Sequence, residues 1–324
     1  MKIKSYLFDA DGSEREVVLG EVDASKLNNQ QLLWINVLER EKETLEYVEK
    51  SLHLKEIPTK RILRIYERPK ISKFQDYYHF FIISVEAAEG SDLRFIPIDF
   101  LVGKTFVLTV HDGDVKYLLD FVKRERGETQ IGDLDAESFV ATMLDLHIAS
   151  YFRVLEKLEH AVDKMDEKIL EKDIKDEDFL KEMVDLRKTV SRLRRWFLPH
   201  RDIFYALSRP DFKQAADEDS VENFQLLNQH FESAVDAIES ARDTVLSLFD
   251  LYATKSAHGM NHSMRQLTFI TLTVGALGVI AGIFGMNFEV AYFRLAETGF
   301  WLTVGGMVFL AFSLAVTAVL RRWI

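Results

Sequence analysis

Hydrophobic and polar residues follow different patterns in different parts of this chain, and each pattern predicts a different kind of element. In residues 1–135, short β-branched and aromatic runs recur between Asp-Gly turns at 11–12 and 112–113, which is typical of strands. The runs are Lys4–Phe8, Glu16–Leu19, Leu33–Val37, Tyr77–Val85, Phe95–Leu101 and Thr105–Val110, with predicted helices at Thr44–Leu52, Lys60–Ile65 and Val115–Lys123. Residues 1–135 are therefore predicted to form an α/β domain.

From Ala136 onward the apolar residues recur mostly at every third or fourth position, which predicts helices. Ala136–Leu170 and Asp176–Leu198 are two of them, and Pro199 ends the second. Asp219 and Ser220 offer an N-cap for a third helix, which meets no further proline before Phe284. That helix of about 65 residues would be on the order of 100 Å long. It needs partners along its length, and copies of itself are the simplest source.

Two uncharged apolar runs close the chain, Leu267–Phe288 and Gly299–Leu320. Each has about the 20 residues that a helix needs to cross a bilayer core. The short linker between them contains Glu289, Arg294 and Glu297. The expected domains are a cytosolic α/β domain at 1–135, a cytosolic helical region and stalk helix at 136–266, a pore-lining transmembrane helix at 267–288, an external loop at 289–298, a second transmembrane helix at 299–320 and a basic cytoplasmic tail at 321–324.

Charge is distributed unevenly along the chain, whose formal net charge is −11. Only Glu289 and Glu297 of the 52 acidic residues follow the stalk region. The acidic surface argues against nucleic acid as a partner. It is compatible with attracting cations, although it can equally serve only to keep a cytosolic domain soluble.

The chain contains no cysteine, which excludes disulfides and thiolate metal sites. Its first residues form no apolar segment, so no signal peptide is expected. Basic residues flank the two apolar runs, with Lys255 and Arg265 before the first and Arg321 and Arg322 after the second. By the positive-inside rule both termini face the cytoplasm. The expected location is the inner (plasma) membrane of a bacterium or archaeon.

The tripeptide Gly285-Met286-Asn287 stands at the end of the first apolar run. Two spans, a tight external loop and a polar Asn at the end of the first span indicate a pore mouth, because a simple anchor needs one span and no specific loop. A structural alternative for Asn287 is a helix C-cap, since Asn tolerates the left-handed conformation.

These residues resemble the CorA family of divalent-cation channels, in its two-span Gly-Met-Asn class. The resemblance covers the whole chain and is strongest at Leu267-Thr268 and over 280–289. Weaker matches are Glu67–Lys70, Gly103-Lys104 with Leu108–His111, and Leu198–Asp202. The resemblance implies a funnel-shaped homopentamer with an α/β cytosolic domain, long stalk helices and first spans that line a central pore. It also implies that Asp250, Asn261, Met264 and Leu267 occupy pore-lining positions.

Magnesium chemistry suits such a pore mouth. Mg²⁺ prefers octahedral oxygen ligands and gives up its water reluctantly, so neutral oxygens that hydrogen-bond the hydrated ion serve it well. Five Asn287 side chains would form such a ring beside the backbone carbonyls of Gly285 and Met286. Glu289 would concentrate cations at the entrance. Asp250 at the cytosolic end is a further candidate metal contact, with a plain surface carboxylate as the alternative.

Counting back from Asn287 at helical spacing selects one rough face of the stalk and first span. It contains Gly282, Gly278, Gly275, Thr271, Thr268, Met264, Asn261, Ser256 or Ala257, and Asp250. Met264 and Leu267 would form an apolar constriction that gates by dewetting, or else ordinary helix contacts. The three glycines either let membrane helices pack closely or widen the pore.

Several residues depart from the family pattern. Members often have Met-Pro where this chain has Gly275-Ala276, Thr in place of Gly278, Tyr in place of Phe284 and an acidic loop with proline in place of Ala291–Leu295. A zinc transporter of the ZntB type is therefore an alternative. His258 and His262 have the i,i+4 spacing that can bind zinc, or they lie at an interface or in solvent.

A third hypothesis is a membrane-anchored scaffold or sensor without transport. The chain shows no P-loop, G-x-S-x-G or H-E-x-x-H motif, so no enzymatic activity and no covalently bound cofactor are expected. Charges alternate along Glu156–Asp185, which predicts a solvated helical hairpin with i,i+4 pairs, or weak contacts to divalent cations. The expected partners are four further copies of the chain, the lipid bilayer and the transported Mg²⁺ or Zn²⁺, with Co²⁺ and Ni²⁺ as further candidates.

Overall fold

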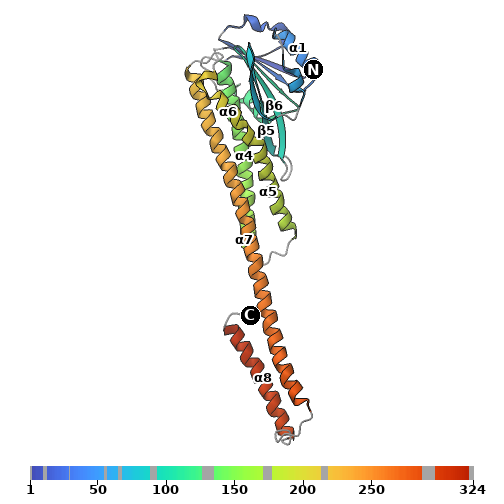
Figure 1. Ribbon diagram of the computed structural model, residues 1–324. Coiled ribbons are helices and arrows are strands. Elements are labelled where there is room, and N and C mark those ends of the chain that lie inside the picture. The colour runs from blue at the N-terminus through green and yellow to red at the C-terminus, as the bar shows by residue number, and fades with distance from the viewer. Residues whose placement is uncertain are drawn as a thin grey trace. The chain divides into compact units, whose positions relative to one another are not determined.

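The protein is seen here as a computed structural model with two compact units, Met1–Leu248 and Phe249–Ile324 (Figure 1). The structure describes residues 2–9, 13–28, 30–54, 57–64, 68–87, 93–125, 135–170, 177–212, 218–286 and 296–320. One helix, α7 (Glu218–Phe284), runs through the boundary between the units. At 67 residues, it is on the order of 100 Å long at 1.5 Å per residue.

The first unit contains a mixed seven-stranded sheet with the strand order β2-β1-β3-β7-β6-β5-β4. The strands are β1 (Ile3–Asp9), β2 (Glu14–Val17), β3 (Gln31–Val37), β4 (Lys70–Lys73), β5 (Tyr77–Ala87), β6 (Leu93–Gly103) and β7 (Phe106–His111). Strands β3 and β7 are parallel, with Leu33 opposite Phe106, and all the other pairs are antiparallel.

Helices cover both faces of this sheet. The α-helices of the unit are α1 (Lys42–Ser51), α2 (Thr59–Ile62), α3 (Lys116–Glu125), α4 (Ala136–Leu170), α5 (Glu177–Phe197), α6 (Arg201–Leu207) and the first part of α7. Short 3₁₀ helices lie at Leu19–Glu21, Ala24–Lys26, Leu198–His200 and Pro210–Phe212. Helix α4 packs on β5, β6 and β7 with α3 beside it, and a separate core joins α1 and α2 to the opposite face.

The central strand β3 shows why this arrangement forms. Leu33, Ile35 and Val37 alternate toward the core that contains α1 and α2. Trp34 points the other way, where its ring lies 5.7 Å from the rings of both Phe121 and Phe139. A strand covered on both faces needs apolar side chains at consecutive positions rather than at alternate ones, and β3 has them.

Most of the predicted elements are confirmed, and the differences have local causes. Strand β2 ends at Val17 because the chain turns there, leaving Val18 61% exposed and burying Leu19. The predicted strand Glu16–Leu19 was therefore placed too late. The predicted helix at Lys60–Ile65 ends at Ile62. The turn at 112–113 is confirmed, and Gly113 adopts φ of 75°, which favours glycine. The turn at 11–12 lies outside the described residues.

Helix α7 begins at Glu218, so the predicted N-cap at Asp219 and Ser220 is wrong. Acidic residues are also stable inside a first helical turn, where they face the positive end of the helix dipole. The helix ends at Phe284, before the predicted end of the first span at 288. Strand β4 and helix α6 were not predicted, because each is short and carries charged residues among its apolar ones.

The second unit consists, in its described part, of the C-terminal part of α7 and of α8 (Ala296–Leu320). Both helices are long and apolar enough to cross a membrane. Their large apolar side chains are mostly exposed, including Leu272, Val279, Phe309 and Phe312. A surface of this kind is stable in lipid rather than in water.

Candidate functional site

In the second unit, α7 has one half-buried face and one exposed face. The half-buried positions recur at three- and four-residue spacing and are Gln266, Phe269, Thr273, Ala276, Leu277 and Ile280. Half-buried or buried residues of α8 follow the same kind of spacing, from Gly299 through Met307 to Ala318. Since these two helices are the described elements of the unit, we infer that the two faces cover one another.

The residues selected from the sequence lie on the opposite side of α7. We call this set the exposed stripe: Asn261, Met264, Thr268, Thr271, Gly275, Gly278 and Gly282, all exposed in the single chain. At 100° per residue the stripe is roughly opposite the half-buried face. Leu267 lies at its flank and is also exposed.

The three glycines of the stripe face open space. A Cβ atom built on Gly275, Gly278 or Gly282 would meet no heavy atom of the described residues within 4 Å. Close packing inside one chain therefore does not account for these glycines. Packing against another copy of the chain and widening of a pore both stay open as explanations.

The end of α7 is closed by two backbone hydrogen bonds. The Gly285 N–H donates to the Ala281 carbonyl at 2.9 Å, and the Met286 N–H donates to the Ile283 carbonyl at 3.2 Å. A Cβ atom on Gly285 would approach the Ala281 oxygen to 3.3 Å, so glycine fits this turn best. Asn287 and Glu289, the main residues of the predicted pore mouth, lie outside the described residues.

Asp250 and the two histidines considered as zinc ligands, His258 and His262, are exposed as well. The Thr254 hydroxyl donates to the backbone oxygen of Asp250 at 2.8 Å. The Nε2 atom of His262 lies 3.2 Å from Nε2 of Gln266. Within the described part of the chain, no group of three or more His, Cys, Asp or Glu side chains could hold a metal ion. A zinc site on His258 and His262 therefore has no third protein ligand there.

The first unit holds a buried ionic cluster that the sequence analysis did not identify. The Arg40 guanidinium pairs with Asp99 and donates to the carbonyls of Ile62, Pro97 and Val110 at 2.6, 2.9 and 3.0 Å. The other carboxylate oxygen of Asp99 lies 2.6 Å from Nε2 of His79. Such a cluster is stable only when its members are nearly all satisfied, and it ties the segment before α1 to β6 and β7. The residues lie far apart in the sequence, so no spacing pattern reveals them.

Comparison with known proteins defines the class and then the family. A family model described as CorA-like Mg²⁺ transporter protein matches residues 29–322. The chain is 25% identical over 275 residues to a cobalt/magnesium transport protein CorA of Thermotoga maritima, across 81% of this chain and 75% of that one.

Solved structures share the fold. The complete CorA magnesium transporter from Methanocaldococcus jannaschii has a TM-score of 0.80 and 21% identity, with 100% of both chains covered. The ZntB cytoplasmic domain from Vibrio parahaemolyticus has a TM-score of 0.62 and 12% identity, across 80% of this chain and 100% of that one.

An α/β domain followed by two apolar helices, the first of which runs through both units, together with the family match defines a membrane protein of the divalent-cation transporter class. Within that class, the chain belongs to the CorA family. The resemblance inferred from the sequence is thereby confirmed, and so is the fold class of an α/β domain, a long helix and two apolar C-terminal helices. Relatives of this family are transporters, which fits the expectation that the chain is not an enzyme.

Proposed function

We propose that this protein carries divalent cations, with Mg²⁺ as the principal one, across a bacterial or archaeal plasma membrane through a pore formed by five copies of α7. The observation that supports the proposal is the exposed stripe, which faces away from α8. Thr and Asn side chains in a membrane helix are stabilised when they face other helices or water rather than lipid. A central pore supplies both.

The ion would enter at the Gly285-Met286-Asn287 turn. A ring of five Asn287 side chains offers neutral oxygens to a hydrated Mg²⁺, whose octahedral water shell is expensive to remove. Glu289 adds negative charge close to the ring and raises the local cation concentration. The ion needs no resident cofactor, because it is itself the cargo and moves down the membrane potential.

Farther along the stripe, the glycines are followed by two threonines, then by the apolar Met264 with Leu267 at its flank, and then by the polar Asn261. Gly275 and Gly278 leave room beside the axis, and Met264 with Leu267 forms a constriction able to close by dewetting. Asp250 meets the ion at the cytosolic end. In this arrangement residues 1–266 and both chain ends face the cytosol. The basic residues that flank the spans favour this orientation, because Lys and Arg are enriched on the cytoplasmic side of membrane helices.

The test is ion flux into liposomes that contain the purified protein, followed with Mg²⁺- and Zn²⁺-sensitive dyes. We expect Asn287→Ala to lower Mg²⁺ flux at least about tenfold, since the polar ring is lost at the narrowest polar site. Asn223→Ala is the matched control. It makes the same substitution at an exposed position in the same helix, within the first unit, and leaves the flux unchanged.

Each other outcome contradicts part of the proposal. Zn²⁺ flux without Mg²⁺ flux would indicate a zinc transporter of the ZntB type. The variants to measure next would then be His258→Ala and His262→Ala. Absence of flux of either ion from correctly assembled protein favours the scaffold or sensor. Native mass spectrometry tests the five copies separately, so a failure of assembly is distinguished from a failure of transport.

A further inference from the structure

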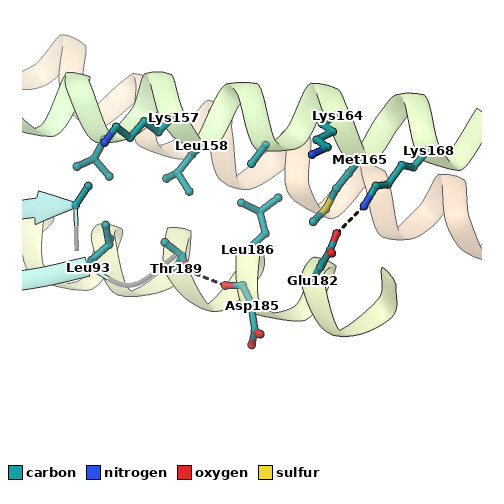
Figure 2. A pocket seen from close by; sticks show the side chains of 13 residues that line it. Leu93, Lys157, Leu158, Lys164, Met165, Lys168, Glu182, Asp185, Leu186 and Thr189 are labelled. Carbon is teal, nitrogen blue, oxygen red and sulfur yellow. Dashed lines mark hydrogen bonds and ion pairs between the residues drawn. The ribbon is translucent and has the colours of Figure 1, made fainter. Parts of the chain in front are cut away.

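A groove runs between α4 and α5, far along the chain from the membrane-spanning helices. It encloses a cavity of about 400 Å³, within the range typical of small-molecule sites. Its floor is apolar and nearly buried, formed by Val154, Leu158, Met165 and Leu186. Figure 2 shows Leu158 and Met165 of α4 pointing toward Leu186 of α5, with Lys157, Lys164 and Lys168 along the α4 side.

A second cavity of about 210 Å³ continues from the first. The two share Ala87, Val154 and Lys157 as lining residues, so they adjoin along α4. The second cavity is more polar. Its other lining residues are Val85, Glu86, Lys116, Tyr117, Asp120, Ser150 and Arg153. We call the two cavities together the α4 cleft; it has a polar end and an apolar end.

Basic side chains remain available in this cleft after the internal pairs are formed. On the acidic side, Glu182 pairs with Lys168 at 2.9 Å, and Asp185 pairs with Lys188 at 3.1 Å. Glu86 accepts a hydrogen bond from the Lys116 backbone N–H at 2.6 Å.

Three cations of α4 take part in no ion pair with the part of the chain that the structure describes: Arg153, Lys157 and Lys164. Arg153 and Lys157 are one helical turn apart and therefore project to the same side. Two carboxylates line the same cavity, Asp120 and Glu86, and Glu86 keeps its charge although it accepts the Lys116 N–H. The Lys116 side chain adds a third cation there, so the cations of the polar end outnumber its carboxylates. The polar end of the cleft is thus suited to an anion.

Tyr117 supplies an independent indication of a ligand. Its side chain is 2% exposed, it lines the polar cavity, and its hydroxyl has no hydrogen-bond partner among the residues that the structure describes. Burial raises the pKa of this hydroxyl, so it stays protonated and is available as a donor. A buried donor without an acceptor is unfavourable, and an anionic oxygen in the adjoining cavity would satisfy it.

We propose that the α4 cleft binds an anionic amphiphile with a single aliphatic chain, a carboxylate or a phosphate monoester. The head group lies between Arg153 and Lys157 and accepts a hydrogen bond from Tyr117. The aliphatic chain lies along Leu158, Met165 and Leu186. A free inorganic anion would leave this apolar floor uncovered. An uncharged chain would leave the Tyr117 hydroxyl without an acceptor and the exposed cations without an anionic partner.

Photolabelling of the full-length protein in lipid nanodiscs tests this assignment. The probe is decanoic acid with a diazirine near the end of its chain, and mass spectrometry locates the labelled residues. We expect labels within the segments 154–168 and 182–189. Unlabelled decanoate and decyl phosphate compete for the site, whereas decanol and inorganic phosphate at the same concentration do not. Labelling confined to α8 and the second half of α7, or competition by inorganic phosphate alone, would overturn the proposal.

Variants separate specific binding from partitioning into lipid. Arg153→Gln and Lys157→Gln should each lower specific labelling about tenfold, the size expected for one charge-assisted hydrogen bond. Ala161→Phe should block the apolar end, because Ala161 lines it and is half exposed. Lys181→Gln is the matched control, an exposed lysine of α5 that does not line the cleft. Equal labelling in all four variants contradicts the site.

Tyr117→Phe gives a readout that a purely structural role would not produce. Removal of a buried hydroxyl without a partner should leave the unfolding temperature of the free protein unchanged or raise it. The same variant should bind the decanoate probe several-fold more weakly. A fall in unfolding temperature with unchanged labelling would show that the hydroxyl supports the fold and not a ligand.

Discussion

The two units of this protein place their apolar residues in opposite ways. In the first unit, Trp34, Phe80 and Phe100 are fully buried within one chain. In the second, side chains of the same kind, such as Trp301, Phe309 and Phe312, are more than half exposed. The first unit therefore has its core within one chain, while the exposed apolar surface of the second is suited to lipid and, in the proposed assembly, to other copies of the chain.

Charged residues are also distributed differently in the two units. The first unit buries Arg40 and Asp99, but it surrounds them with hydrogen-bond partners. The two apolar runs carry no charge at all. The comparison teaches that an exposed side chain means different things in the two units. In the first unit it faces water, and in the second it faces lipid or, in the proposed assembly, a pore or another copy of the chain.

The largest expected effect is loss of the first unit's own core. Trp34 is fully buried, and its Nε1–H donates to the Thr109 hydroxyl at 3.0 Å. We expect Trp34→Ala to lower the free energy of unfolding by about 4 kcal/mol, which corresponds to a fall of roughly 10 °C in the unfolding midpoint. Thermal unfolding of the full-length protein measures it.

Tyr205→Ala is the control for this variant. Tyr205 is an aromatic residue of α6 that is 61% exposed, so its removal should change the free energy of unfolding by less than about 0.5 kcal/mol. Comparable losses in the two variants would mean that the exposed aromatics of the first unit are covered by another molecule, and the contrast between the units would fail.

The next effect compares one substitution in the two units. Phe309, near the middle of α8, is 74% exposed, and Phe152 of α4 is 40% exposed. A lysine in the middle of a membrane helix costs about 3 kcal/mol, so Phe309→Lys should lower the amount of assembled protein in the membrane and its stability in nanodiscs. Phe152→Lys should change stability by less than about 0.5 kcal/mol. Equal effects would indicate that Phe309 does not face lipid.

A smaller effect is the pH dependence of stability that His200 gives to the first unit. The backbone N–H of Ile83 donates to Nε2 of His200 at 2.8 Å, so Nε2 carries no proton and Nδ1 donates to the Phe197 carbonyl, also at 2.8 Å. Protonation would break the bond to Ile83. Burial lowers the pKa of His200 from 6.5 to about 4, and the neutral form is the one that fits.

The sign of this effect follows from the lowered pKa. The unfolded chain takes up a proton near pH 6.5, whereas the folded protein does so only near pH 4, so the stability is complete above 6.5 and is lost progressively below it. At about pH 5 the loss is roughly 2 kcal/mol. His200→Gln should shrink the difference between the unfolding midpoints at about pH 7 and pH 5. The neighbouring His147, whose pKa burial also lowers, keeps part of the dependence. An unchanged difference would exclude His200.

Local patterns in the sequence were sufficient for the long helices, but not for the short helix α6 or for the pairing of the strands. The absence of proline predicts α7 almost residue for residue, since helix formation depends on neighbours along the chain. The parallel pairing of β3 with β7 joins residues about 70 positions apart, and no spacing encodes it. Strand β4 is held by β5 rather than by its own composition, which is why it was not predicted.

The two candidate sites likewise differ in how much of each could be predicted from the sequence. The exposed stripe lies on one helix, so its spacing could be read from the sequence. The α4 cleft lies between helices, and its charges had been read as pairs within each helix. The ion pairs between 156 and 185 include Lys168 with Glu182, which joins α4 to α5. Because some of these charges pair across helices, the cations that take part in no ion pair can be identified only from the three-dimensional structure.

The smallest expected effect is that of a surface ion pair in the first unit. Arg201 of α6 binds Glu232 of α7 through two hydrogen bonds of 2.9 and 2.7 Å, and both side chains are partly exposed. A double-mutant cycle with Arg201→Gln and Glu232→Gln should give a coupling below about 1 kcal/mol that weakens as salt is added. A coupling of several kcal/mol that is insensitive to salt would mean that water is excluded from this pair, as it would be if another copy covered α6 and α7. In the second unit a single charge is expected to cost several times more, because there the alternative to a partner is lipid rather than water.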